Sequence, residues 1–196
     1  MDRTLFPLPN LRTERLHLRS MTLADAEDLA ERRSDPVTAE FQSWIAPYPV
    51  ERARALIAEV TEHSGPTPGA WYQMAIERLE DSRVVGDVAV YLGENGKTAE
   101  VGYTLHAWAR GEGYATEAAT ALIDFLVDVV GVHRIEATTH PDNISSHRLL
   151  GRLGFTAEGV KRESYWVGDV VTDDAIFGLL AREWLARRST ERAPSA

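Results

Sequence analysis

A stretch that could bind phosphate runs over residues 108–118 (WARGEGYATEA), where a strand-like segment is followed at once by an amphipathic helix. Gly111 and Gly113 flank Glu112, and the backbone amides of this stretch would lie at the start of the helix. A helix start carries unpaired N–H groups and the positive end of the helix dipole, which attract an anion. A short glycine motif also occurs in ordinary turns. Two interpretations therefore stay open at this point, a phosphate-binding loop and a plain tight turn.

The elements on either side of this stretch are predicted from their apolar periodicity. Residues 100–106 (EVGYTLH) alternate apolar and other side chains, which is typical of a strand. From residue 115 to residue 130, apolar side chains recur at steps of three and four, which predicts a helix with one apolar face. Gly131 is expected to end that helix.

The rest of the chain predicts strands and helices in an α+β order rather than a strict alternation. Short polar turns between successive strands indicate an antiparallel meander before the long helix. We predict strands over residues 15–19, 70–78, 83–92, 98–106, 134–139, 155–162, 165–167 and 170–180. Helices are predicted over residues 22–33, 50–63 and 115–130 and from Ser145 or Ser146 to Gly154, with a last helical turn or two from Ala181.

Length and composition predict one folded domain. The chain has 196 residues, of which 44% are apolar, and this is enough for a single substantial core. Pro7 and Pro9 indicate an irregular amino-terminal arm over residues 1–13. The domain is expected to span residues 14–185 and to be followed by a flexible basic tail over residues 186–196.

Charge and cysteine content exclude several classes of function. The chain contains no cysteine, so disulfides, thiolate metal sites and an acyl-cysteine intermediate are ruled out. A formal net charge of −9 argues against binding to nucleic acid or to an acidic membrane. The sequence shows no signal peptide, no membrane span and no metal-ligand spacing. We therefore expect a soluble, cytoplasmic protein without a metal.

Three blocks of sequence together resemble a known family. Arg110, Gly113 and Ala115 match an Arg-x-x-Gly-x-Ala signature, which continues as GYATEA over residues 113–118. Residues 141–146 (PDNISS) and 153–155 (LGF) form the second block, and residues 100–105 (EVGYTL) form the third. In this order and spacing, the chain from about residue 12 to residue 184 resembles the GCN5-related N-acetyltransferases (GNAT), and among them the RimJ/RimL-type branch.

The resemblance implies a GNAT fold and acetyl-CoA as the donor substrate. That fold is α+β, with a mixed, mostly antiparallel central sheet that is splayed at the acetyl-CoA site and has helices on both faces. Asn143 is expected to bind the pantetheine arm, although an Asx-turn or a helix cap would explain it as well. The residues implied in cofactor binding are Tyr103, Leu105, Arg110, Gly111, Gly113, Tyr114, Ala115, Thr116, Asn143 and Ser146.

The resemblance also implies the residues that carry the chemistry. Leu150 stands where many GNAT enzymes have a tyrosine that protonates the thiol, so Ser146 is expected to take this role, with a capping serine as the alternative. Glu100 and Glu163 are candidates for the general base, although each could equally be a solvated strand residue. Tyr165 stands where the branch that acetylates a ribosomal stalk protein has a glutamate, which puts that substrate in doubt.

The expected function is acetyl transfer from acetyl-CoA directly to a primary amine in a ternary complex. The acceptor would be a protein amino terminus or a small amine, and a homodimer would fit the family. The alternative is a catalytically silent acyl-CoA sensor or interaction module on the same fold. The identity of the acceptor, the general base, the oligomeric state and the length of the acyl group stay open. Candidate acceptor-binding residues are Trp44, Tyr48 and Trp166. For Trp44 and Tyr48, packing under a long loop is the alternative.

Overall fold

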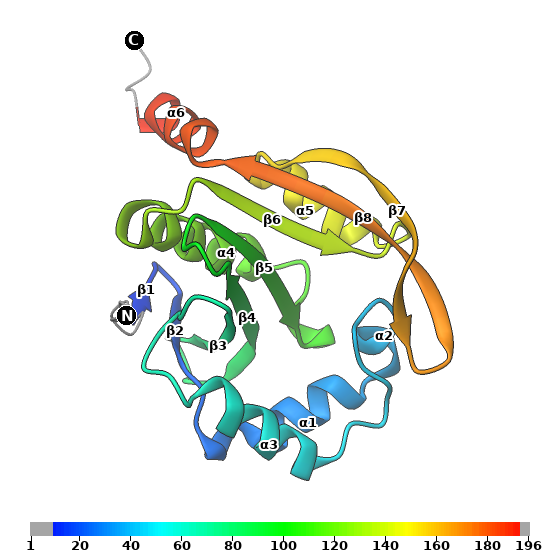
Figure 1. Cartoon of the computed structure of the whole chain (residues 1–196). Helices are drawn as coiled ribbons and strands as arrows, with labels where there is room; N and C mark the ends of the chain where they lie inside the picture. Colours follow the sequence, from blue (N-terminus) through cyan, green and yellow to red (C-terminus); the bar gives the residue numbers. More distant parts are fainter. Residues whose placement is uncertain (1–9, 193–196) are drawn as a thin grey trace.

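An eight-stranded sheet with helices on both faces forms the protein, as Figure 1 shows. The computed structural model describes the backbone of residues 10–192 and the side chains of residues 10–190. The strand order is β1-β2-β3-β4-β5-β6-β8-β7. The strands are β1 (Leu11–Arg12), β2 (Leu16–Ser20), β3 (Ala70–Arg78), β4 (Val84–Leu92), β5 (Thr98–Leu105), β6 (Arg134–Thr139), β7 (Thr156–Val167) and β8 (Val170–Leu180), and the helices are α1 (Ala26–Ser34), α2 (Pro36–Ala39), α3 (Val50–Val60), α4 (Tyr114–Phe125), α5 (Ile144–Leu153) and α6 (Ala181–Arg192).

Strands β3 to β5 form the antiparallel meander that the polar turns predicted, and β2 pairs antiparallel with β3 on its other side. Strand β5 then pairs in parallel with β6, because helix α4 carries the chain back between them. This parallel pairing covers only Thr98 with Arg134, Ala99 with Ile135 and Glu100 with Glu136. The prediction of a mixed, mostly antiparallel sheet is thereby confirmed.

Two apolar clusters lie on opposite faces of the sheet. Alternate residues of β4, such as Val88 and Val90, belong to the larger cluster, which contains the apolar faces of α4 and α5. Ala75 of β3 belongs to the smaller cluster, which contains side chains of α1 and α3. The period of two along each strand therefore places α4 and α5 on one face and α1 and α3 on the other.

The long helix begins and ends close to its predicted bounds but is not uniform. Helix α4 ends at Phe125, and a π-helical turn over Leu126–Val130 continues it to Gly131. Gly131 has a φ of 75°, so it closes the helix in the left-handed conformation that glycine adopts without steric cost. No helix within residues 10–192 is long and apolar enough to cross a membrane.

Both ends of the predicted domain carry more regular structure than expected. Leu11 and Arg12 pair with β2 as strand β1, inside the segment that was predicted to be an irregular arm. Helix α6 runs past residue 185, where a flexible tail was predicted, because Trp184 is buried and Arg188 binds Asp124 of α4. Residues 1–9 and 193–196 lie outside the described residues, so the division into arm, domain and tail stays a prediction.

A buried network of hydrogen bonds and ion pairs connects helix α1 to the middle of the sheet. The fully buried Arg32 donates to Asp87 Oδ2 of β4 at 2.6 Å and to Asp28 Oδ2 at 2.5 Å. Gln73 of β3 donates to the other oxygen of Asp87 at 2.7 Å, and His106 Nε2 lies 2.9 Å from Asp28 Oδ1. The network therefore joins α1, β3, β4 and the end of β5, where the predicted phosphate-binding stretch begins.

We predict that Arg32→Ala lowers the free energy of unfolding by about 3–5 kcal/mol, because the buried carboxylate of Asp87 would lose its cation. Arg54→Ala is the matched control, since the Arg54–Glu27 pair is 53% and 78% exposed and such pairs contribute at most about 1 kcal/mol. Urea unfolding of both variants measures the difference. Equal losses in the two variants would contradict a special role for the buried network.

Candidate active site

A cleft opens where strands β5 and β6 separate. After their three paired residues, β5 stays with β4 up to Leu105 and β6 stays with β8 up to Thr139. Residues 101–105 and 137–139 thus face each other across the gap without a ladder. The cleft on the α1 side has a volume of about 580 Å³, which is within the range of small-molecule sites. Its walls are formed by Glu40, Phe41, Gln42, Ser43, Trp71, Glu100, Val101, Gly102, Thr138, Thr139, His140, Tyr165, Val167, Thr172, Asp173 and Asp174.

The loop between β5 and α4 presents the start of a helix that no side chain caps. Gly111 has a φ of 85° and Gly113, the N-cap residue, has a φ of 82°. Within the described residues, no side chain accepts a hydrogen bond from the first turn of α4, whereas Asp35 caps α2 and Asn143 caps α5. The backbone N–H groups of this first turn are therefore free to bind an anion.

Side chains from the other end of the sheet hold the first turn of α4 in place. Glu117 accepts hydrogen bonds from Thr13 Oγ1 at 2.5 Å, from the Arg15 N–H at 2.9 Å and from Arg15 Nε at 2.7 Å. Burial alone would raise the pKa of Glu117, but these hydrogen bonds outweigh it and the pKa is lowered. Arg15 also donates to the Glu112 carbonyl and lies over the ring of the buried Tyr114. The loop is thus fixed before any ligand binds.

Arg110 connects this loop to the acceptor side of the cleft. Its Nη2 donates to Thr38 Oγ1 at 2.7 Å, and Thr38 Oγ1 donates to Asp35 Oδ2 at 2.5 Å. Thr38 belongs to α2, which is followed directly by cleft residues 40–43. The Arg110 side chain therefore joins the two sides of the site in this structure, which leaves the backbone of the loop to receive phosphate.

Tyr103 and Ser146 meet across the gap between β5 and α5. The Tyr103 hydroxyl and Ser146 Oγ are 2.7 Å apart. Burial raises the pKa of Tyr103 to about 12, although the hydrogen bond with Ser146 acts in the opposite direction. The structure thus places Ser146 in a side-chain pair and gives the capping role to Asn143, whose Oδ1 accepts from the Ser146 N–H at 3.1 Å. Leu105 packs in the larger core cluster.

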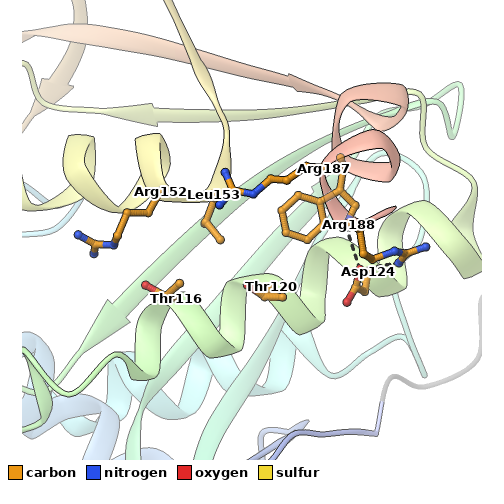
Figure 2. A pocket seen from close by; sticks show the side chains of 8 residues that line it. Thr116, Thr120, Asp124, Arg152, Leu153, Arg187 and Arg188 are labelled. Atoms are coloured by element: carbon orange, nitrogen blue, oxygen red, sulfur yellow. Dashed lines mark hydrogen bonds and ion pairs between the residues drawn. The ribbon is translucent and has the colours of Figure 1, made fainter. Parts of the chain in front are cut away.

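A second cavity, of about 290 Å³, lies on the other side of α4, between α4, α5 and α6 (Figure 2). Thr116 and Thr120 form its floor, and Arg152, Arg187 and Arg188 surround it. Arg188 is paired with Asp124 and Asp128. The first residue that lines this cavity, Thr116, directly follows Ala115 of the signature. The cavity therefore lies next to the helix start that could bind an anion.

The two candidate bases lie in different surroundings. Glu100 lines the cleft at the last paired position of β5, and burial is the main cause that raises its pKa, with Glu136 and Asp174 acting in the same direction. Glu163 is exposed in an irregular part of β7, has a φ of 51°, and is not among the residues that line the cleft. The structure therefore brings Glu100, and not Glu163, to the cleft.

The three aromatic residues expected on the acceptor path lie elsewhere. Trp44 and Tyr48 are only 6% and 4% exposed and pack in the smaller core cluster, where Arg33 stacks on both rings. Trp44 Nε1 also donates to the Arg33 carbonyl at 2.9 Å. Trp166 is 62% exposed and does not line the cleft. Packing under a long loop, the alternative considered for Trp44 and Tyr48, describes them better.

Among the aromatic residues that line the cleft, Trp71 was not singled out from the sequence. Phe41 stacks on His140 with ring centroids 5.1 Å apart, and Trp71 and Tyr165 form further walls. They come from three distant segments, so no periodic pattern connects them. Position alone could have identified His140, since it directly follows the strand that ends beside Asn143. Within residues 10–190, no three His, Cys, Asp or Glu side chains could hold a metal ion, and the absence of a metal stays a prediction.

Comparison with known proteins places this geometry in a family. Residues 15–156 match the family model described as "Acetyltransferase (GNAT) domain". The chain is 35% identical over 180 residues to "Uncharacterized N-acetyltransferase p20" of Bacillus licheniformis, which covers 90% of this chain and 99% of that protein. It is 32% identical over 88 residues to the "[Ribosomal protein uS5]-alanine N-acetyltransferase" of Escherichia coli, which covers 45% of each. A solved acetyltransferase (GNAT family) from Bacillus anthracis superposes with a TM-score of 0.78 at 22% identity, over 88% of this chain and 99% of that one.

We predict opposite effects when alanine replaces two glycines at which a Cβ would meet no clash. At Gly113 it would lie 3.5 Å from Arg15 Nη2, an ordinary contact, and at Gly151 it would meet open space. Gly113→Ala should lower the free energy of unfolding by about 1–2 kcal/mol, because its φ of 82° is strained for any L side chain. Gly151→Ala, inside α5, should raise it by about 0.5–1 kcal/mol. Urea unfolding checks both signs. A stabilised Gly113→Ala variant would show that the loop does not hold its left-handed residue.

Proposed function

The chain belongs to the RimJ/RimL-type branch of the GNAT acetyltransferases. On that basis we propose that it transfers the acetyl group of acetyl-CoA directly to a primary amine in a ternary complex. As a member of this family it is an acetyl-CoA-dependent N-acetyltransferase. The observation that carries the proposal is the separation of β5 from β6 beside an uncapped helix start. One opening thus adjoins both an anion-binding loop and a cleft of about 580 Å³.

On the donor side, the phosphates of coenzyme A would lie on the amides at the start of α4. The helix dipole and the free N–H groups favour negative charge there. The pantetheine arm would enter between β5 and β6, where residues 101–105 can pair with its amides in the manner of an added strand. The pairing of β5 with β6 ends at Glu100 and Glu136, so an added strand could pair there without any rearrangement of the sheet.

On the acceptor side, Glu100 is our candidate for the general base. An ammonium group must lose a proton before its nitrogen can attack the thioester carbonyl carbon. Glu100 lines the cleft, and its raised pKa makes it a better proton acceptor than an ordinary surface carboxylate. We assign Glu163 no part in the reaction, since it lies outside the cleft.

The departing thiolate would take its proton from Ser146. When the bond between the carbonyl carbon and sulfur breaks, the sulfur needs a nearby acid. Tyr103 remains protonated at neutral pH because its pKa is about 12, and its hydroxyl can therefore donate to Ser146 Oγ. That arrangement leaves the hydrogen of Ser146 free to point toward the sulfur.

A protein amino terminus is the acceptor that the relatives support. The Escherichia coli relative acts, by its name, on an alanine of ribosomal protein uS5. Release of coenzyme A from acetyl-CoA in the presence of a panel of amino-terminal peptides and small amines tests the proposal. Turnover with any member supports it. Binding of acetyl-CoA without turnover across the whole panel would support the silent sensor instead.

We predict that Glu100→Gln lowers kcat by about 10²-fold or more, because the variant has no carboxylate to accept the proton. In the wild type, kcat/KM should fall as the pH drops through the raised pKa of Glu100, above the ordinary value of 4.5, since only the carboxylate form is a base. In the variant, kcat/KM should not show this fall at low pH, which is the acidic limb of the pH profile. A pH profile of both proteins measures it, and an unchanged limb in Glu100→Gln would assign the base to another group.

We predict that Ser146→Ala lowers kcat by about 10²-fold while the Kd of acetyl-CoA changes little. Ser145→Ala is the matched control, because Ser145 is the exposed neighbour in the same helical turn. Steady-state rates and calorimetric titration with acetyl-CoA separate the two effects. Equal kcat in both variants would show that Ser146 serves only to position α5.

A further inference from the structure

The cleft on the acceptor side contains negative side chains without positive ones. Four carboxylates line it, those of Glu40, Glu100, Asp173 and Asp174, and no lysine or arginine is among its lining residues. Within residues 10–190, none of the four forms an ion pair. The cleft therefore favours a positively charged occupant.

The donor side has the opposite charge. Arg15 donates to the loop carbonyl of Glu112, and Arg152, Arg187 and Arg188 surround the cavity beyond Thr116 (Figure 2). Asp124 also lines this cavity and pairs with Arg188, so three arginines face one carboxylate there. The sheet thus separates a region with an excess of arginine, which suits the phosphates of coenzyme A, from an acidic one. Because the two regions differ in sign, the acidity of the cleft does not simply follow from the net charge of −9.

Asp173 and Asp174 are positioned by the hairpin that carries them. Asp173 Oδ1 accepts from the Glu163 N–H at 2.8 Å, and Asp174 Oδ2 accepts from Ser164 Oγ at 2.8 Å. Each carboxylate keeps a second oxygen for a ligand. Lys161 lies opposite Asp174 across the β7–β8 ladder but is not among the residues that line the cleft. Burial raises the pKa of Glu100, and the positive charge of Lys161 acts in the opposite direction.

We propose that the acceptor carries a second positive charge, which Asp173 and Asp174 bind while Glu100 receives the proton of the reacting amine. This inference rests on the proposed function and narrows its substrate class. The aromatic rings of Phe41, Trp71 and Tyr165 complete the site, since aromatic faces and carboxylates together suit an alkyl ammonium. A diamine and a peptide with a basic residue after its amino terminus both have this chemistry.

Matched acceptors test the charge requirement. Coenzyme A release is measured with 1,4-diaminobutane against 1-aminobutane at about pH 7.5, where an alkyl ammonium is protonated. We expect kcat/KM to be at least about tenfold higher for the diamine, because a hydrogen bond to a charged group contributes this much. Peptides that begin Ala-Arg or Ala-Gln form the second arm, which distinguishes a peptide acceptor from a diamine.

Two double variants show whether the carboxylates cause the preference. In Asp173→Asn/Asp174→Asn, which keeps an accepting oxygen at each position, the preference should shrink to below about threefold. Glu59→Gln/Glu62→Gln is the control, since it removes the same charge from exposed positions at the end of α3. The control should keep the full preference.

The outcomes separate this inference from the proposed function. Acetylation of 1-aminobutane or the Ala-Gln peptide at the same rate as its dicationic partner would overturn the inference and leave the function standing. A preference that survives in the Asp173→Asn/Asp174→Asn variant would overturn it as well. If no acceptor releases coenzyme A, the proposed function fails, and calorimetric titration of both amines into the enzyme with coenzyme A still decides the charge preference. Tighter binding of the diamine supports the inference, and equal binding overturns it.

Discussion

The site depends on a parallel pairing that lasts for only three residue pairs. Beyond Glu100 and Glu136, β5 remains with β4 and β6 remains with β8, so the sheet opens along its middle. Both neighbouring ladders continue, and the opening therefore costs no backbone hydrogen bonds elsewhere. The same separation exposes the β5 edge to the donor and brings α5 with Ser146 opposite Tyr103. Without it, the loop and the cleft would belong to different surfaces.

Rigidity around the opening comes from polar contacts that connect distant segments. Glu117 binds Thr13 and Arg15, and Arg110 binds Thr38, so the loop is fixed from the amino-terminal strands and from α2. The buried Arg32 fastens α1 to the sheet on the acceptor face. A preorganised loop binds its ligand without a further loss of conformational entropy, which favours affinity. In the proposed function, charge of opposite sign on the two sides would orient donor and acceptor.

Prediction from sequence succeeded where the signal is local and failed where it is distant. The periodic strands and helices and the helix ends at Gly131 and Gly154 follow from patterns within short windows. Trp44 and Tyr48 were predicted to line the acceptor path, but they pack in the smaller core cluster. Aromatic residues among prolines can form either the wall of a binding site or part of a core. Only their burial against α1 and α3 distinguishes the two. The strand at Leu11 and the length of α6 likewise depend on packing partners far along the chain.

The sequence by itself determined the family, because three motif blocks resemble the GNAT enzymes, and that resemblance implied the donor and the loop that would receive it. The helices and strands followed from glycines, caps and apolar periods, which act over a few residues. The tertiary structure decided what surrounds the reacting groups. It gave the capping role to Asn143 and left Ser146 to pair with Tyr103, and it brought Glu100 beside the hairpin carboxylates. These relations join residues that lie dozens of positions apart, and their geometry is set by how strands diverge and helices pack rather than by any local pattern.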